Sequence, residues 1–201
     1  MLLGVVHLDL CTRAFRLSRR KACAGLRVCI GLPKLLATPE AIVHIGDRES
    51  DIYELFVAGQ DAGTHFLFCT CLDRLIGNDG YRVSAVMEEM RVKGLHRIEV
   101  RDKKGHVSQA VLELRYRRLR IQPQAGKKKR YPELDLTVLH AQERGTPLGR
   151  HAVDWKLIID LPIASRQQAI EKLHWYYWYT IRWKIETFLL RTCQIDVQSG
   201  E

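Results

Sequence analysis

The sequence lacks the features that mark several large classes of protein. Its longest apolar runs fall far short of the roughly 18 residues that a membrane-spanning helix needs. The opening stretch, MLLGVVHLDL, has no basic leader and no small-residue cleavage site, and Asp9 interrupts it, so it predicts a strand and not a signal peptide. The six cysteines follow no disulfide-framework spacing. We therefore expect a protein of the reducing cytoplasm without a membrane span.

Common catalytic and cofactor motifs are also missing. The chain contains no P-loop, no G-x-G-x-x-G and no G-x-S-x-G elbow, which argues against the nucleotide-binding and hydrolase classes that depend on them. His65, Cys69 and Cys71 are spaced closely enough to suggest zinc, but no second pair of residues has ligand spacing. Zinc is therefore disfavoured, and no internal repeat or low-complexity tract is present.

The composition is that of an ordinary globular protein with an excess of positive charge. The chain has 201 residues, of which 46% are hydrophobic and 27% charged, which suits one domain or one domain with an insertion. Its formal net charge is +9. A basic balance of this size favours an anionic partner, with nucleic acid ahead of an anionic membrane surface.

The basic excess is confined to residues 91–130. This segment has 14 Lys and Arg against three acidic residues, a net charge of +11, so the rest of the chain sums to −2. Clustered cations favour phosphate contact through counterion release, although a solvated loop without a partner is the alternative. The candidate DNA contacts here are Arg115, Arg117, Arg118, Arg120, Lys127, Lys128, Lys129 and Arg130.

The hydrophobic pattern predicts an interrupted α/β protein. Residues 2–10 and 41–46 read as strands, a helix with Ser50 or Asp51 as N-cap follows and ends at Gly63, and residues 64–72 read as the next strand. Short alternating runs then indicate an antiparallel β insertion. The predicted parts are 1–77 (first part of the core), 78–153 (basic β insertion) and 154–201, with a strand at 155–163 and a long helix over 166–193 capped by Ser165.

Two groups of residues suggest chemistry. Asp47 ends an apolar strand, where α/β folds place metal or substrate ligands, although it is equally suited to capping a helix. Tyr179, Arg182 and Glu186 recur at spacings of three and four and so share one helix face. There the carboxylate could join Asp47 around a metal while the guanidinium holds a phosphate. The alternative is a surface Arg–Glu pair beside a core tyrosine. Trp155 is suited either to core packing or to stacking on an unpaired base.

The blocks HIGDRESDIYELF (44–56) and YTIRWKIETF (179–188) resemble the two signature blocks of bacterial insertion-sequence DDE transposases with a long β insertion. The second block is similar to their Y-x2-R-x3-E signature, and WKLIIDLP (155–162) extends the resemblance across most of the chain.

This resemblance implies an RNase H-like core whose β insertion precedes the glutamate-bearing helix. It also implies metal-dependent cleavage and strand transfer of DNA in the bacterial nucleoid, with two Mg²⁺ (or Mn²⁺) held by three carboxylates. Asp47 then resembles the second catalytic aspartate and Glu186 the catalytic glutamate, both as metal ligands. Tyr179 and Arg182 resemble phosphate contacts, and Trp155 the residue that helps hold a flipped base.

The sequence departs from the family in ways that affect activity. No strand carries the family's first aspartate before a threonine, and Cys193 stands where the signature lysine would fall. The family's N-terminal DNA-binding domain and C-terminal dimerisation helices have no counterpart. We therefore expect a fragment that is marginally stable and inactive alone, with a second copy or an intact transposase as its protein partner. The main alternative is a non-enzymatic basic DNA-binding module or an inhibitor of an intact transposase. Another RNase H-like nuclease is the weaker alternative.

Overall fold

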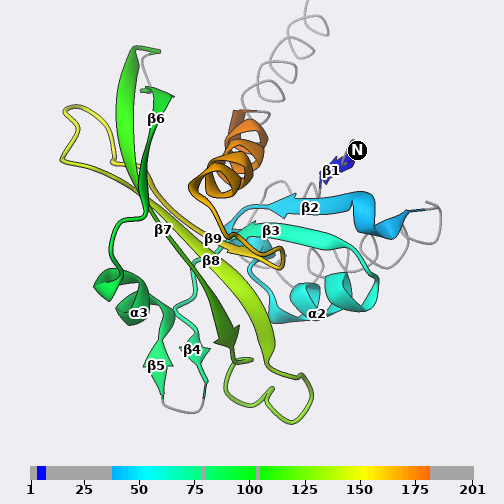
Figure 1. The fold of residues 1–201 in the computed structure, drawn as a ribbon. Helices are drawn as coiled ribbons and strands as arrows, with labels where there is room; N and C mark the ends of the chain where they lie inside the picture. The colour runs from blue at the N-terminus through cyan, green and yellow to red at the C-terminus, as the bar shows by residue number, and fades with distance from the viewer. Residues whose placement is uncertain (1–3, 8–37, 78–79, 103–104, 182–201) are drawn as a thin grey trace, which may run out of the picture.

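The protein is a mixed α/β protein built on one nine-stranded sheet (Figure 1). The computed structural model describes residues 4–7, 38–77, 80–102 and 105–181. Eight strands form a continuous path in the order β1-β2-β3-β9-β8-β7-β4-β5, and β6 pairs with β7 off this path. Strands β1, β2 and β3 are parallel, and every other pairing is antiparallel.

The first half of the chain contains β1 (Gly4–His7), a 3₁₀ turn η2 (Pro39–Ala41), β2 (Ile42–Gly46), a 3₁₀ turn η3 (Arg48–Ser50), α2 (Tyr53–Asp61), β3 (His65–Cys69), β4 (Leu75–Ile76), β5 (Tyr81–Arg82) and α3 (Val83–Glu89). The second half contains β6 (Gly94–Arg101), β7 (Val107–Ile121), β8 (Leu134–Glu143), β9 (Asp154–Ile159) and a helix whose described residues are 166–181.

Both faces of the sheet are buried. On one face, residues such as Ile45, Leu114 and Leu157 pack against Leu173 and Tyr176 of helix 166–181. On the other face, three stacked phenylalanines from α2 and β3 form the centre of a second cluster that also contains Met87 of α3. Figure 1 shows helix 166–181 and α2 on opposite sides of the sheet. Alternating strand residues explain this division, because successive side chains of a strand point to opposite faces.

Several sequence-based expectations are confirmed and one is wrong. Strands occupy most of the residues predicted for β2, β3, β7, β8 and β9. The N-cap of α2 is Ile52, which makes no side-chain capping bond, so neither Ser50 nor Asp51 caps that helix. The predicted β-rich insertion also contains a helix that the sequence did not predict, α3, in which VSAVMEE buries Val83 and Met87 at a spacing of four.

Strand β7 changes the face that it buries. Ala110, Leu112, Leu114 and Tyr116 belong to the cluster under helix 166–181, whereas Leu119 and Ile121 belong to the α2 cluster. The register with β8 runs without interruption from Leu112 to Ile121, so the change comes from the sequence pattern and not from a bulge. Arg117 and Arg118 stand at the changeover, and both are exposed.

Helix 166–181 begins with the predicted cap. The Ser165 hydroxyl accepts a hydrogen bond from Gln168 N at 3.2 Å, and the Gln168 side chain accepts one from Ala164 N at 2.8 Å. This reciprocal pair satisfies backbone donors at the helix start. Among the described residues, no helix combines the length and apolar character needed to cross a membrane.

Candidate functional site

Asp47 directly follows β2, at the sheet edge where β3 also ends. Its Oδ1 accepts a hydrogen bond from Glu49 N at 2.9 Å, so the carboxylate caps η3. The side chain is nevertheless partly exposed. The capping alternative raised by the sequence is therefore correct for Asp47, and it leaves the carboxylate at the carboxyl end of a parallel strand, where such folds place ligands.

The face of helix 166–181 that carries Tyr176 lies beside this strand end. Burial raises the pKa of Tyr176 well above its usual range, and the neighbouring Cys69 and the negative charge of Asp47 raise it further. Tyr179, one turn along, stacks on Tyr176 with ring centroids 6.0 Å apart and planes 26° apart. Tyr179, the first residue of the second block, therefore packs on a tyrosine that lies near the end of β2.

Two of the predicted site residues, Arg182 and Glu186, lie outside the described residues. Within the described ranges, no group of three His, Cys, Asp or Glu side chains is placed to hold a metal ion. Asp47 is the one proposed metal ligand among them, so these residues alone do not make up a metal site.

Trp155, in β9, packs against the same face of helix 166–181 as Tyr176. It is partly buried against the cluster under helix 166–181, and its ring meets Tyr176 edge-on, with centroids 5.5 Å apart. Tyr177 lies 6.4 Å from it. The indole thus contributes to the packing of helix against strand while part of its surface remains accessible.

The sequence did not predict the role of Asp51. Its carboxylate is buried and accepts hydrogen bonds from Thr70 Oγ1 at 2.7 Å and from the backbone N–H groups of Cys71 and Leu72, both at 3.0 Å. The same carboxylate forms a buried ion pair with Arg74. Asp51 therefore holds the loop after β3 against the turn that carries Asp47.

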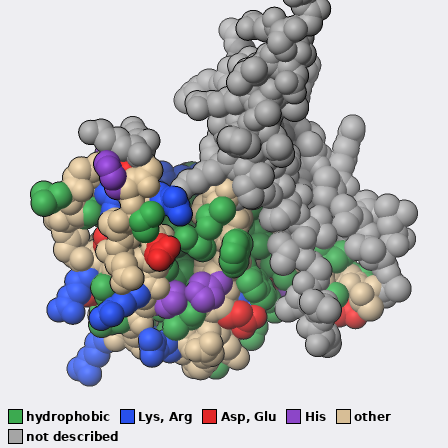
Figure 2. Space-filling view, turned by 90° about the horizontal axis from the view of Figure 1, so that it is seen from above, with side chains coloured by type: hydrophobic (Ala, Val, Ile, Leu, Met, Phe, Trp, Pro, Cys, Tyr) green, Lys and Arg blue, Asp and Glu red, His purple; other side chains and the backbone are tan. Residues whose placement is uncertain are grey.

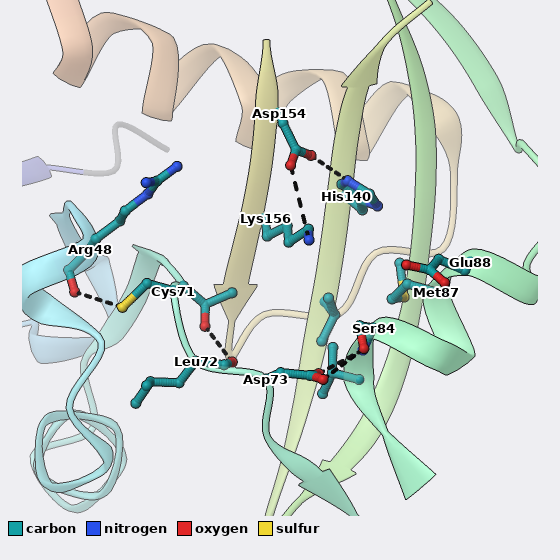
Figure 3. A pocket seen from close by; sticks show the side chains of 13 residues that line it. Arg48, Cys71, Leu72, Asp73, Ser84, Met87, Glu88, His140, Asp154 and Lys156 are labelled. Atoms are coloured by element: carbon teal, nitrogen blue, oxygen red, sulfur yellow. Dashed lines mark hydrogen bonds and ion pairs between the residues drawn. The ribbon is translucent and has the colours of Figure 1, made fainter. Parts of the chain in front are cut away.

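A cavity of about 240 Å³, lined by both polar and apolar side chains, opens beside this loop on the α3 side of the sheet (Figure 3). His140 of β8 and Asp154 of β9 approach to 2.6 Å in its wall, and Lys156 lies 4.0 Å from the same carboxylate. Asp73 accepts hydrogen bonds from both the backbone and the hydroxyl of Ser84. Every carboxylate named here already has a protein partner.

The arginines of β7 do not form one surface. Alternation along the strand puts Arg115 and Arg117 on one face and Arg118 and Arg120 on the other. The guanidinium of Arg115 donates to Met90 O and pairs with Glu113 at 3.1 Å, so it is held inside the protein. Arg120 makes an exposed ion pair with Asp135, and Arg118 donates to the Asp160 carbonyl.

The run 127–130 forms a turn after β7. Lys127 pairs with Glu54 of α2 at 2.6 Å, which ties the turn to the core. Lys128 and Lys129 are exposed, and Arg130 lies over the ring of Tyr131. Seen from above, Lys and Arg side chains are scattered among hydrophobic, acidic and His side chains over the described part of this face (Figure 2).

Comparison with models of known protein families and with characterised proteins finds no match for this chain.

Proposed function

We propose that this chain forms part of the catalytic core of an insertion-sequence DDE transposase with an RNase H-like fold, whose substrate is DNA. One observation carries the proposal: Tyr176, three residues before the second block, packs in the same cluster as Ile45 of β2 and lies close enough to Asp47 of the first block for the carboxylate to raise its pKa. Tyr176 also stacks on Tyr179, the first residue of the second block. A chance resemblance of two short blocks, more than 120 residues apart in the sequence, gives no reason for them to meet.

Within this proposal, the sheet edge that carries Asp47 faces the scissile phosphate. The Tyr179 phenol and, by the resemblance, Arg182 hold the DNA backbone there, Trp155 receives an unpaired base, and Asp47 and Glu186 provide carboxylate ligands. Mg²⁺ or Mn²⁺, when bound, would supply an activated oxygen nucleophile and stabilise the leaving oxygen. Because the described residues do not by themselves form a metal site, we assign no catalytic step to them.

The basic turn and the exposed arginines of β7 serve as phosphate contacts in this proposal. The exposed arginines lie on both faces of β7. This arrangement suits DNA that is contacted from more than one side, by different subunits or by different segments of one chain. Since the sequence offers no counterpart of the first catalytic aspartate, we expect the 201-residue chain alone to bind DNA without cutting it. A Mg²⁺- or Mn²⁺-dependent cut at a transposon end, lost in Asp47→Ala, would refute the expected inactivity.

The competing proposal, a non-enzymatic basic DNA-binding module, rests on the same charge and assigns no role to Asp47. The two are separated by measuring affinity for a duplex with a recessed 3′-end, by fluorescence anisotropy, in Mg²⁺ and in KCl of equal ionic strength. If the carboxylates bind metal at the DNA, Mg²⁺ strengthens binding by the wild type and not by the Asp47→Ala, Glu186→Ala double variant.

A matched control is Asp61→Ala, because Asp61 is an exposed carboxylate at the end of α2. It should behave as the wild type does. Equal affinities of the wild type and the double variant in both salts would overturn the transposase proposal and favour the binding module.

A further inference from the structure

Helix 166–181 is tied to the edge strand β6 by three side chains. Arg166 Nη2 donates to Leu95 O at 2.8 Å, and the Tyr177 hydroxyl donates to Glu99 O at 3.2 Å. Between them, His174 of the helix meets His96 of the strand, with their Nε2 atoms 3.1 Å apart. The contacts join segments almost 80 residues apart in the sequence.

The two imidazoles are close enough to serve as a pair of metal ligands. Their Nε2 atoms share a hydrogen bond, and their ring centroids are 5.0 Å apart with planes at 59°. Metal–imidazole bonds of about 2.05 Å would span this separation with an N–metal–N angle of about 100°, between octahedral and tetrahedral values. A shared ion would replace the proton of this hydrogen bond, with a rotation of the two rings and no change in the distance between the donor atoms.

Exposure and a lowered pKa favour metal binding at this pair, although the positive charge of Arg166 opposes it. His174 is exposed and His96 partly so, which leaves room for water to complete the coordination shell. Burial, His174 and Arg166 lower the pKa of His96, which keeps its imidazole in the neutral form that binds metal. Imidazole ligands suit Ni²⁺, Cu²⁺ and Zn²⁺ and are poor ligands for Mg²⁺.

We propose that His96 and His174 form a two-histidine site for a divalent transition-metal ion, which fastens β6 of the basic insertion to helix 166–181. The site is independent of the proposed DNA chemistry, since it uses neither Asp47 nor Glu186. Metal binding at this site would therefore affect how β6, and with it the basic insertion, is held against helix 166–181.

The test uses Ni²⁺ on the full chain, because thiolates of the six cysteines compete more strongly for Zn²⁺ and Cu⁺ than for Ni²⁺. Isothermal titration calorimetry counts the sites, and thermal unfolding with and without NiCl₂ reports stabilisation. At a Ni²⁺ concentration about 100 times the Kd, linkage predicts a Tm rise of roughly 5–10 °C for a chain of this size.

Two variants test the assignment. His174→Gln keeps a hydrogen-bonding group of similar reach opposite His96 but removes the imidazole, and His96→Gln does the same from the strand. Each should lose one Ni²⁺ site and the Tm rise while keeping the metal-free Tm within a few degrees. His151→Gln is the matched control, since His151 is exposed and lies outside the pair.

A Tm rise of equal size in the wild type and in both variants would overturn the proposal, as would the absence of any Ni²⁺-induced rise in the wild type. Loss of the rise in His151→Gln as well would assign the effect to scattered surface histidines and would also overturn it.

Discussion

The Asp51 carboxylate and the Arg74 guanidinium form an ion pair in which both side chains are almost wholly buried, with exposed fractions of 1% and 2%. The guanidinium also lies over the rings of Tyr53 and Phe56 of α2. The pair therefore joins the turn after β2, the loop after β3 and the first turn of α2. Because both charges are buried, removal of either side chain would leave the charge of the other without a partner in the protein interior.

Removal of one partner should be strongly destabilising. Asp51→Asn leaves the Arg74 charge buried without its carboxylate, and we expect a loss of about 3–5 kcal/mol in the free energy of unfolding. Urea denaturation monitored by circular dichroism measures it. Asp61→Asn, which changes an exposed carboxylate at the end of α2, should change stability by no more than about 0.5 kcal/mol. Similar stabilities of the two variants would contradict the role given to Asp51.

The role of Asp51 shows where sequence reasoning stops. Its partners Thr70, Cys71, Leu72 and Arg74 lie about 20 residues away, and only the folded loop brings their donors to one carboxylate. Local signals were informative where the structure is local. The alternating run 134–143 became β8, and Ser165 caps the helix that follows β9.

A hydrophobic pattern that changes within one strand, or that covers only a short helix, was harder to interpret. The arginines of β7 looked like one surface because the sequence does not say that the buried face changes at Arg117 and Arg118. α3 was missed because seven residues with two buried positions resemble a short alternating strand. The sequence did not predict that Tyr176 lies near Asp47, because the shared helix face concerned Tyr179, Arg182 and Glu186, of which the last two lie outside the described residues.

Different cations of the basic segment should contribute differently to DNA binding. Lys128 and Lys129 are exposed, so their double replacement by alanine should reduce the slope of log affinity against log salt by about 2. Arg115 already donates to Met90 O and pairs with Glu113, so Arg115→Ala should leave that slope unchanged. Anisotropy titrations at several KCl concentrations measure both. An equal loss of slope in the two variants would mean that Arg115 turns outward to reach DNA.

Acid should destabilise the fold through His44. This histidine of β2 is fully buried, its Nε2 lies 3.1 Å from Thr64 Oγ1, and burial lowers its pKa to about 4. Since an unfolded histidine has a pKa of about 6.5, the unfolded chain binds more protons between these values. Stability due to this group is therefore complete above pH 6.5 and is lost as the pH falls towards 4, by up to about 3 kcal/mol.

The measurement is urea unfolding at pH 7.5 and 4.5. His44→Gln should be less stable than the wild type at pH 7.5 but should lose less stability on acidification. His151→Ala, which removes an exposed histidine, should keep the full wild-type pH dependence. An unchanged pH dependence in His44→Gln would show that other groups dominate acid unfolding.

Gly46 makes room for the turn that positions Asp47. A Cβ atom at this position would lie 2.3 Å from Ser50 Oγ, 2.6 Å from Ser50 Cβ and 3.0 Å from the ring of Phe68. Because Ser50 is buried and η3 folds directly back onto β2, the serine has nowhere to move without shifting the turn. We expect Gly46→Ala to cost about 1–3 kcal/mol through overpacking.

The same geometry predicts a specific rescue. Ser50→Gly removes both close atoms, so the Gly46→Ala, Ser50→Gly double variant should be more stable than the sum of the two single losses predicts, by about 1 kcal/mol or more. Urea denaturation of all four proteins completes the cycle. Additive losses would mean that the cost of the added methyl group comes from its contact with Phe68 and not from its contact with Ser50. Coupling would establish that close contact between positions 46 and 50 fixes the turn, and with it the place of the Asp47 carboxylate at the end of β2.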